Sequence, residues 1–481
     1  MNPLVLEVLV VSLGIALLMV EAFSPKPDKR LLAWIGMAGL ATVFVLTFFV
    51  GTVPPGSPTA AFYTADSFAI FFKRFALVST ILVLAMSIDY LPVVARFVPS
   101  EREGGGLGEF LALPVLTCAG LMWMASAADF ISIFVSLELV TISFYVLVAY
   151  MRRSNAGLEA GTKYLILGAL STGFVVYGIT WIFGMTGQTN LRAISEVVTG
   201  GYPAANIPAL LFGVGLVIIA LGFKVAAFPF QFWVPDVYQG APTPITAFLS
   251  VGSKAAGFVV LLRVLEPFSA VPAIWEKLSA VLAVVAGATL IYGNLAAIPQ
   301  QNLKRLLSYS SVGHAGYLLM AVASIGAVLP GREAWPAIGF YLAAYLLMTF
   351  LAFFVLAVAG GDEISHFNGL ARRAPWLAAA LLVSMISLAG IPFTAGFLGK
   401  LLLFDVALSA GNYVLVGIGV LTVACGFYFY LRVVGAMYWQ PVPDGAAPIR
   451  VSVTAKVAMA LLAVLIFVLG VFPQPVLSLL D

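Results

Sequence analysis

The chain has 481 residues, of which 62% are hydrophobic and 9% are charged, and its formal net charge is +3. An average soluble domain carries about 25% charged residues, and a mean hydropathy of +1.08 leaves more apolar surface than a globular core can bury. This composition excludes soluble enzymes and disordered scaffolds. It also excludes nucleic-acid binders, because no basic tail is present. We expect a polytopic membrane protein whose surroundings are the lipid bilayer.

The hydrophobic stretches predict helices that cross a membrane. Such a helix needs roughly 20 apolar residues, whereas a strand of a membrane barrel alternates apolar and polar residues over about ten. Apolar stretches long enough for such helices follow one another along the whole chain. We therefore predict an all-α fold with about fourteen transmembrane helices, at 3–23, 31–51, 67–91, 109–127, 130–151, 160–185, 206–240, 242–265, 278–298, 305–328, 335–359, 376–410, 413–439 and 452–475.

Lys and Arg are distributed unequally over the connections between these spans. Cytoplasmic loops carry the excess of positive charge, so the odd-numbered connections are predicted to be cytoplasmic. An even number of spans then places both termini on the outer side. The odd-numbered connections hold Lys26, Lys29, Arg30, Arg96, Arg102, Arg152, Arg153, Lys304, Arg305, Arg372, Arg373 and Arg450, and the even-numbered ones hold Arg192, Lys277 and Arg332.

Spans seven and twelve are too long for one crossing, and each is interrupted. The interruptions lie at 227–231 and 390–396, where Pro229 and Pro392 remove backbone donors. Freed backbone groups at membrane depth are tolerated only inside protein or beside water. Paired interrupted helices in two halves point to an inverted-repeat transporter, with two ordinary proline kinks as the alternative.

Spans 4–8 and 9–13 are the predicted inverted repeats, since an odd number of spans reverses the direction of the repeat that follows. The predicted domains are a three-helix segment at 1–108, a first repeat at 109–266, a second repeat at 267–440 and a C-terminal helix at 441–481.

Four ionisable residues lie well inside spans: Glu138, Lys224, Lys254 and Lys400. A charge at a helix centre costs about 2.5–3.5 kcal/mol even on the lenient insertion scale. Burial brings a lysine into a range where it gains and loses protons, which arginine cannot do. We predict that the four residues form a proton relay. The alternative is a static Glu138–Lys224 ion pair, with the other lysines reaching toward an interface.

Lys304 and His314 are further candidates in the tenth span. Lys304 stands beside Arg305 and would serve equally well as a cytoplasmic anchor. An imidazole passes protons near neutral pH, but a lone histidine in a helix is also often a packing residue. We expect the abundant Tyr, Trp and Phe at membrane interfaces and assign them no chemistry.

Motifs for cofactor and metal chemistry are missing from the sequence. Two cysteines, Cys118 and Cys425, are too few for a disulfide framework, a cysteine-ligated iron–sulfur cluster or a zinc site built on cysteine pairs. There is no phosphate-binding loop, dinucleotide fingerprint or His-Glu-x-x-His motif. We expect this chain to hold no cofactor and no metal.

Long motifs surround the buried lysines. The first, Phe223–Pro244, contains Phe-Pro-Phe-Gln-Phe-Trp-Val-Pro-Asp-Val-Tyr-Gln-Gly-Ala-Pro-Thr-Pro and is followed by Phe248–Lys254. The others are Asn302–Ser311, Gly390–Pro392 and Gly396–Lys400. These motifs resemble those of the antiporter-like membrane subunits of respiratory complex I, NADH:quinone oxidoreductase. The Asp236–Pro244 sequence in the first motif and Lys400 in the last motif favour subunit N, the chain 2 type of mitochondria, over subunits M and L.

The resemblance implies a proton-translocating membrane-arm subunit in a bacterial cytoplasmic membrane, coupled to quinone reduction in other subunits. In that family the span-five glutamate pairs with the span-seven lysine, the span-eight lysine links the halves, and the span-twelve lysine leads outward. These roles fall on Glu138, Lys224, Lys254 and Lys400. Lys304 and His314 correspond to a relay position that varies between subunits.

The resemblance also implies partners. These are the other antiporter-like and small membrane subunits of the complex, without nucleic acid. NADH, FMN, iron–sulfur clusters and quinone belong to partner subunits.

Two other classes stay open. A related cation/proton antiporter or membrane-bound hydrogenase subunit shares the fold and the charged series but has different partners. An unrelated metabolite transporter predicts no such series. Neighbouring genes for quinone-reductase subunits, or co-purification with NADH dehydrogenase activity, separate the first class from the complex I subunit.

Overall fold

The computed structural model describes residues 2–23, 28–54, 56–99, 105–326, 334–443, 445, 449 and 451–480. Four of the residues used to predict the orientation, Lys26, Arg102, Arg332 and Arg450, lie outside these ranges. The α-helices are α1 (Val5–Phe23), α2 (Arg30–Leu46), α3 (Ser67–Phe97), α4 (Leu107–Ser126), α5 (Phe130–Val148), α6 (Asn155–Thr186), α7 (Leu191–Thr199), α8 (Ile207–Val225), α9 (Val234–Gly240), α10 (Thr243–Phe248), α11 (Lys254–Ser269), α12 (Pro272–Ala297), α13 (Leu303–Ala323), α14 (Ala334–Ala359), α15 (Leu370–Arg373), α16 (Pro375–Ala389), α17 (Ala395–Ser409), α18 (Tyr413–Trp439), α19 (Val453–Val471) and α20 (Gln474–Leu477).

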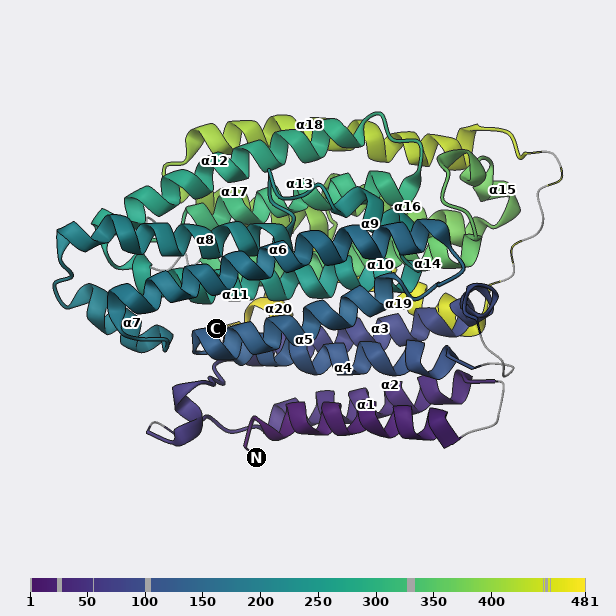
Figure 1. The fold of residues 1–481 in the computed structure, drawn as a ribbon. Coiled ribbons are helices and arrows are strands. Elements are labelled where there is room, and N and C mark those ends of the chain that lie inside the picture. Colours follow the sequence, from purple (N-terminus) through teal and green to yellow (C-terminus); the bar gives the residue numbers. More distant parts are fainter. Residues whose placement is uncertain are drawn as a thin grey trace.

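The helices confirm the predicted polytopic all-α fold. Within the described ranges, thirteen helices are long and apolar enough to cross a membrane. One of them is the 27-residue helix Thr243–Ser269, which joins α10 and α11 through a π-helical turn at Leu249–Ser253. The one predicted span not among these thirteen is the twelfth, at 376–410, which is the interrupted pair α16 and α17. Both chain ends lie on the side of the bundle that carries α7, and α15 lies on the opposite side (Figure 1).

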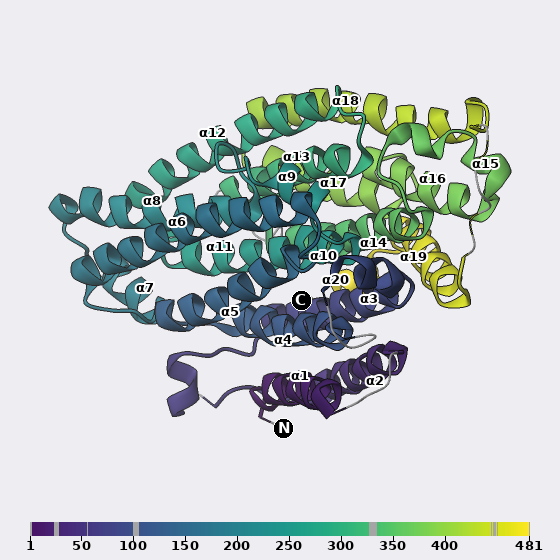
Figure 2. The same ribbon diagram turned by 45° about the vertical axis from the view of Figure 1, so that its right-hand side comes forward.

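The bundle has a buried centre and two outer edges. Helices α1 and α2 form one edge and α12 and α18 the other, in both views (Figures 1 and 2). Helices α11, α13 and α14 lie between them, and almost all of their side chains are buried. Polar side chains on these three helices are therefore shielded from lipid.

Both predicted interruptions are present, and they share one local structure. Helix α8 is followed by Ala226 (φ 65°) and α16 by Gly390 (φ 90°), both in the left-handed region. The next residue's N–H then bonds a carbonyl five residues back, Ala227 to Gly222 and Ile391 to Ile386, as in a Schellman cap. The first interruption is longer than predicted, because α9 begins only at Val234 and has seven residues.

A pair of isolated β-bridges supports the inverted repeats. Asp129, which caps α5, pairs with Asn190, and Asn302, which caps α13, pairs with Glu363. Asn302 follows Asp129, and Glu363 follows Asn190, by the same number of residues in the sequence. Asn190 precedes α7 and Glu363 precedes α15, which lie at opposite ends of the bundle (Figure 1). The two bridges are thus equivalent parts of repeats with opposite directions.

Candidate functional site

Lys224 lies in the last turn of α8, directly before the first interruption. Its side chain is 5% exposed, and Nζ donates a hydrogen bond of 2.5 Å to the Thr141 hydroxyl of α5. The C-terminal end of a helix carries partial negative charge and favours a cation. The ammonium group is thus held by a helix end and a hydroxyl.

Glu138 lies one turn before Thr141 on α5, so both groups lie near the same face. Its carboxylate accepts a hydrogen bond of 2.7 Å from the Thr172 hydroxyl of α6. Among the ion pairs of the described residues, none joins Glu138 to Lys224. The direct pair that was expected is thus replaced by two threonine contacts, and a proton would need an intermediate group to pass between these residues.

Lys254 begins α11 directly after the π-helical turn, a local distortion that is frequent at functional sites. The side chain is 2% exposed. Its Nζ donates to both the hydroxyl and the backbone carbonyl of Ser311 on α13. The same ammonium group lies 5.4 Å from the ring centre of Tyr345 on α14. Lys254 thus connects the first repeat to the centre of the second.

Lys400 lies in α17, just after the second interruption, and reaches back across it. Its Nζ donates to the carbonyls of Leu388 and Ala389, at 2.8 and 2.9 Å, which belong to the last turn of α16. The ring centre of Tyr317 lies 5.3 Å away. The interruption therefore supplies this lysine with free carbonyls at the end of a helix, where a positive charge is favoured.

His314 lies on α13 between the surroundings of Lys254 and Lys400, and it is 3% exposed. Its Nδ1 is 2.6 Å from the Tyr341 hydroxyl and its Nε2 is 3.1 Å from the Tyr430 hydroxyl. Tyr430 also contacts the Ser310 hydroxyl. Histidine and serine, one turn apart on α13, are therefore joined by the phenol of a different helix.

The expectation that tyrosines occupy only the interfaces does not hold for Tyr238, Tyr317, Tyr341, Tyr345 and Tyr430. These side chains are buried, and each forms a hydrogen bond to a hydroxyl, an imidazole or a carbonyl. A usable signal was present in the sequence, because Tyr341 and Tyr345 are one helical turn apart in the middle of an apolar span. Gln231 was also missed. It is 1% exposed, and neither end of its amide has a hydrogen-bond partner among the described atoms.

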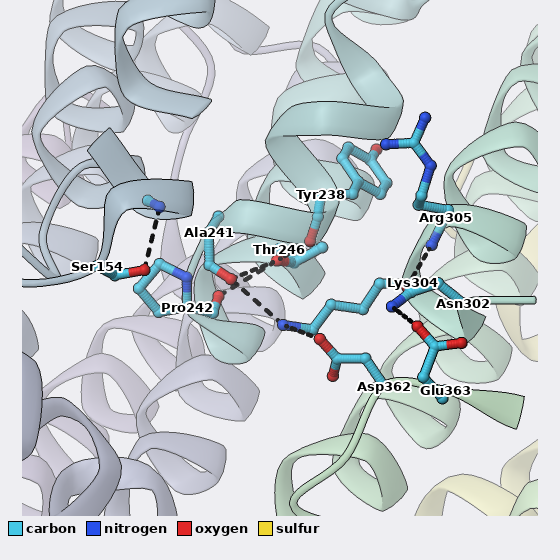
Figure 3. Close-up of polar contacts among 11 residues, drawn as sticks. Ser154, Tyr238, Ala241, Pro242, Thr246, Asn302, Lys304, Arg305, Asp362 and Glu363 are labelled. Carbon is cyan, nitrogen blue, oxygen red and sulfur yellow. Dashed lines mark hydrogen bonds and ion pairs between the residues drawn. The ribbon is translucent and has the colours of Figure 1, made fainter. Parts of the chain in front are cut away.

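Lys304 occupies a different setting, among polar groups in the first turn of α13 (Figure 3). Its Nζ lies 3.5 Å from the Asp362 carboxylate and 3.4 Å from the Ala241 carbonyl. The neighbouring Arg305 pairs with Asp236, which also binds Lys163 of α6. These contacts fasten α13 to α9 and to the loop before α15, so Lys304 matches the anchor alternative better than the relay.

Comparison with known proteins identifies the family of this fold and site. The family described as "NADH:quinone oxidoreductase/Mrp antiporter, TM" matches residues 127–426. NADH-quinone oxidoreductase subunit N of Moorella thermoacetica is 39% identical over 99% of this chain and 96% of that protein. The subunit N of Trichlorobacter lovleyi is 40% identical over the same shares.

Solved structures agree with these relatives. A chain of respiratory complex I from Thermus thermophilus is 32% identical, covers 98% of both chains and has a TM-score of 0.80. A chain of the Mrp complex from Dietzia sp. has a TM-score of 0.83 at 20% identity over 99% of this chain and 96% of that chain. This second match shows the shared fold alone.

Proposed function

The chain belongs to the NADH:quinone oxidoreductase/Mrp antiporter transmembrane family, and from this premise we propose that it translocates protons as subunit N of a respiratory NADH:quinone oxidoreductase. Glu138, Lys224, Lys254, His314 and Lys400 carry the protons. The chemistry of NADH, FMN, iron–sulfur clusters and quinone takes place in partner subunits. Its partners are the other antiporter-like and small membrane subunits of the complex.

One observation carries this proposal: the relay lysines are held by uncharged groups. Lys224, Lys254 and Lys400 contact hydroxyls and carbonyls, and no described carboxylate lies within ion-pair distance of them. A lysine of this kind can release its proton without leaving a buried carboxylate unpaired, which would be costly. The surroundings thus tolerate both the charged and the neutral form.

Other buried cations of the chain are paired with carboxylates. Lys73 lies 2.8 Å from Glu7, and Lys29 lies 2.7 Å from Glu21. Arg263 lies 2.6 Å from Asp66. Burial alone would raise the pKa of Asp66, but the hydrogen bond and charge of Arg263 lower it below its ordinary value. These pairs join the N-terminal helices to each other and to α11.

We also propose a membrane, an orientation and a division into repeats for this chain. The complex lies in a bacterial cytoplasmic membrane, with both termini of this chain on the outer side. The functional divisions are 1–108, 109–266, 267–440 and 441–481. The excess of Lys and Arg in the odd-numbered connections supports the orientation, and the matching interruptions support the two repeats.

Substitution of Glu138 tests whether its charge is used. Glu138→Gln keeps the contact with Thr172 but cannot take up a proton, so pumping should fall strongly while the complex assembles. Glu138→Asp keeps the charge with a shorter reach and should be milder. Glu159→Gln on α6 is the control, because that carboxylate is 64% exposed. Equal loss of assembly in both Glu138 variants would instead indicate a structural carboxylate.

A further inference from the structure

Two tyrosines beside the first repeat's charged residues have buried hydroxyls without a hydrogen-bond partner among the described atoms. They are Tyr145 of α5 and Tyr164 of α6, and their ring centres are 5.2 Å apart. An unsatisfied buried polar group costs about 1–3 kcal/mol, and native structures keep few of them. Phenylalanine would fill the same space without this cost, so the hydroxyls call for an explanation.

The Tyr145 hydroxyl points toward the surroundings of Glu138. It lies against Gly168 of α6, where a Cβ atom would come within 2.0 Å of the phenol oxygen. The Thr172 hydroxyl, one turn further on, lies 3.2 Å from the Gly168 carbonyl and 2.7 Å from the Glu138 carboxylate. The absence of a side chain at Gly168 thus gives the phenol its place beside the Thr172–Glu138 contact.

Tyr164 continues in the direction of Lys254. Its side chain is fully buried, and its hydroxyl lies near the Ser253 hydroxyl, directly before Lys254, and within electrostatic range of both Tyr145 and Tyr238. The Tyr238 hydroxyl is 3.2 Å from Ser311 Oγ, and Ser311 accepts a hydrogen bond from Lys254. Hydroxyl groups therefore follow one another from Glu138 to Lys254 on a line that does not include Lys224.

We propose that Tyr145 and Tyr164, bridged by water, form a second proton connection between Glu138 and Lys254, parallel to Lys224. The carboxyl O–H of protonated Glu138 breaks, and its proton passes to the first member of the chain. Each hydroxyl or water accepts one proton and releases another, until a new N–H bond forms on neutral Lys254. Glu138 loses one proton, Lys254 gains one, and both phenols are unchanged.

The test uses Tyr164→Phe and Tyr145→Phe in the complete complex, with Tyr177→Phe as the matched control on α6. Tyr177 is 52% exposed, so its hydroxyl should be dispensable. We expect Tyr164→Phe to lower the ratio of protons pumped to NADH oxidised by about twofold or more, since a positioned proton-transfer group typically contributes more than that. The ratio in the control should be unchanged.

Thermal stability separates this role from a structural one. Removal of an unpaired buried hydroxyl relieves a cost, so Tyr164→Phe should unfold at the same or a higher temperature although it pumps less well. A normal pumping ratio in the assembled Tyr164→Phe complex would overturn the proposal. If Tyr145→Phe does not assemble, the Tyr164→Phe variant alone decides.

This inference rests on the proposed function, and one further variant separates the two. Lys400→Met should stop pumping whether or not the tyrosine connection exists. Normal pumping in Lys400→Met would contradict the proposed function itself. Loss in Lys400→Met together with a normal ratio in Tyr164→Phe would contradict only the tyrosine connection.

Discussion

At the scale of single residues, the partners of a buried lysine distinguish two classes. Lys73 and Lys29 face carboxylates and hold helices together, whereas Lys224, Lys254 and Lys400 face hydroxyls and carbonyls. A buried carboxylate left without its cation costs several kcal/mol. A serine hydroxyl or a helix-end carbonyl can instead bond water or a neutral amine. Release of the lysine's proton therefore costs less in the second class.

His314 adds a directional element between Lys254 and Lys400. A neutral imidazole has one donor and one acceptor nitrogen, so it must donate to one of its two tyrosine partners and accept from the other. Exchange of the tautomer reverses this order and corresponds to the movement of one proton through the ring. The hydroxyls of Tyr341 and Tyr430 are thus placed to donate a proton to the histidine and to accept one from it.

Tyr430→Phe should interrupt this connection while leaving the helices packed. The variant removes the contacts to His314 and Ser310 but keeps the ring, so we expect normal assembly and reduced pumping, measured as NADH-driven acidification of inverted vesicles. Tyr428→Phe on the same helix is the control, because that side chain is 60% exposed. Equal pumping in both variants would remove Tyr430 from the relay.

At the scale of helices, the two interruptions expose helix ends inside the bundle. A Schellman cap satisfies part of the last turn of α16, and the carbonyls of Leu388 and Ala389 bind the Lys400 ammonium. An uninterrupted helix would use these carbonyls for its own next turn. The break at Gly390 is therefore what creates the lysine's binding place.

Gly390→Ala tests this dependence. Alanine in the left-handed region costs roughly 1–2 kcal/mol, and its Cβ would lie 3.2 Å from both Cδ and Nζ of Lys400. Gly187→Ala at the end of α6 has similar backbone strain (φ 68°) but open space around the Cβ. We expect comparable losses of thermal stability and a larger loss of pumping in Gly390→Ala. Equal pumping by the Gly390→Ala and Gly187→Ala variants would show that proton transfer at Lys400 does not depend on the geometry of this break.

At the scale of the whole molecule, the sequence was sufficient for the spans and both interruptions, because long apolar runs and Pro229 and Pro392 are local signals. The burial of Lys224, Lys254 and Lys400 was also predictable, whereas Glu138 is only half-buried. The partners of these four residues were not predictable, because Thr172 and the Leu388 carbonyl come from other segments. Tyr238, Tyr317 and Tyr430 were missed since a single aromatic residue in an apolar span does not reveal which way it points, whereas the spacing of Tyr341 and Tyr345 was a signal that could have been used.

The proposed orientation of the molecule can be checked with reporters. A reporter inserted in the 362–374 loop should read cytoplasmic, and one fused at the C-terminus should read external, because the odd-numbered connections hold most of the Lys and Arg. A reporter between α6 and α7 is the control and should also read external. Opposite readings at all three positions would reverse the orientation and the direction in which Lys400 delivers protons.

The central claim, that a lysine carries protons through this chain, is tested most directly at Lys400. Lys400→Arg keeps the charge beside the Leu388 and Ala389 carbonyls but does not release a proton at working pH, and Lys400→Met removes the charge together with its burial cost. Quinone-dependent acidification of membrane vesicles should be lost in both variants, although both complexes assemble. Normal acidification by the assembled Lys400→Arg complex would contradict the account.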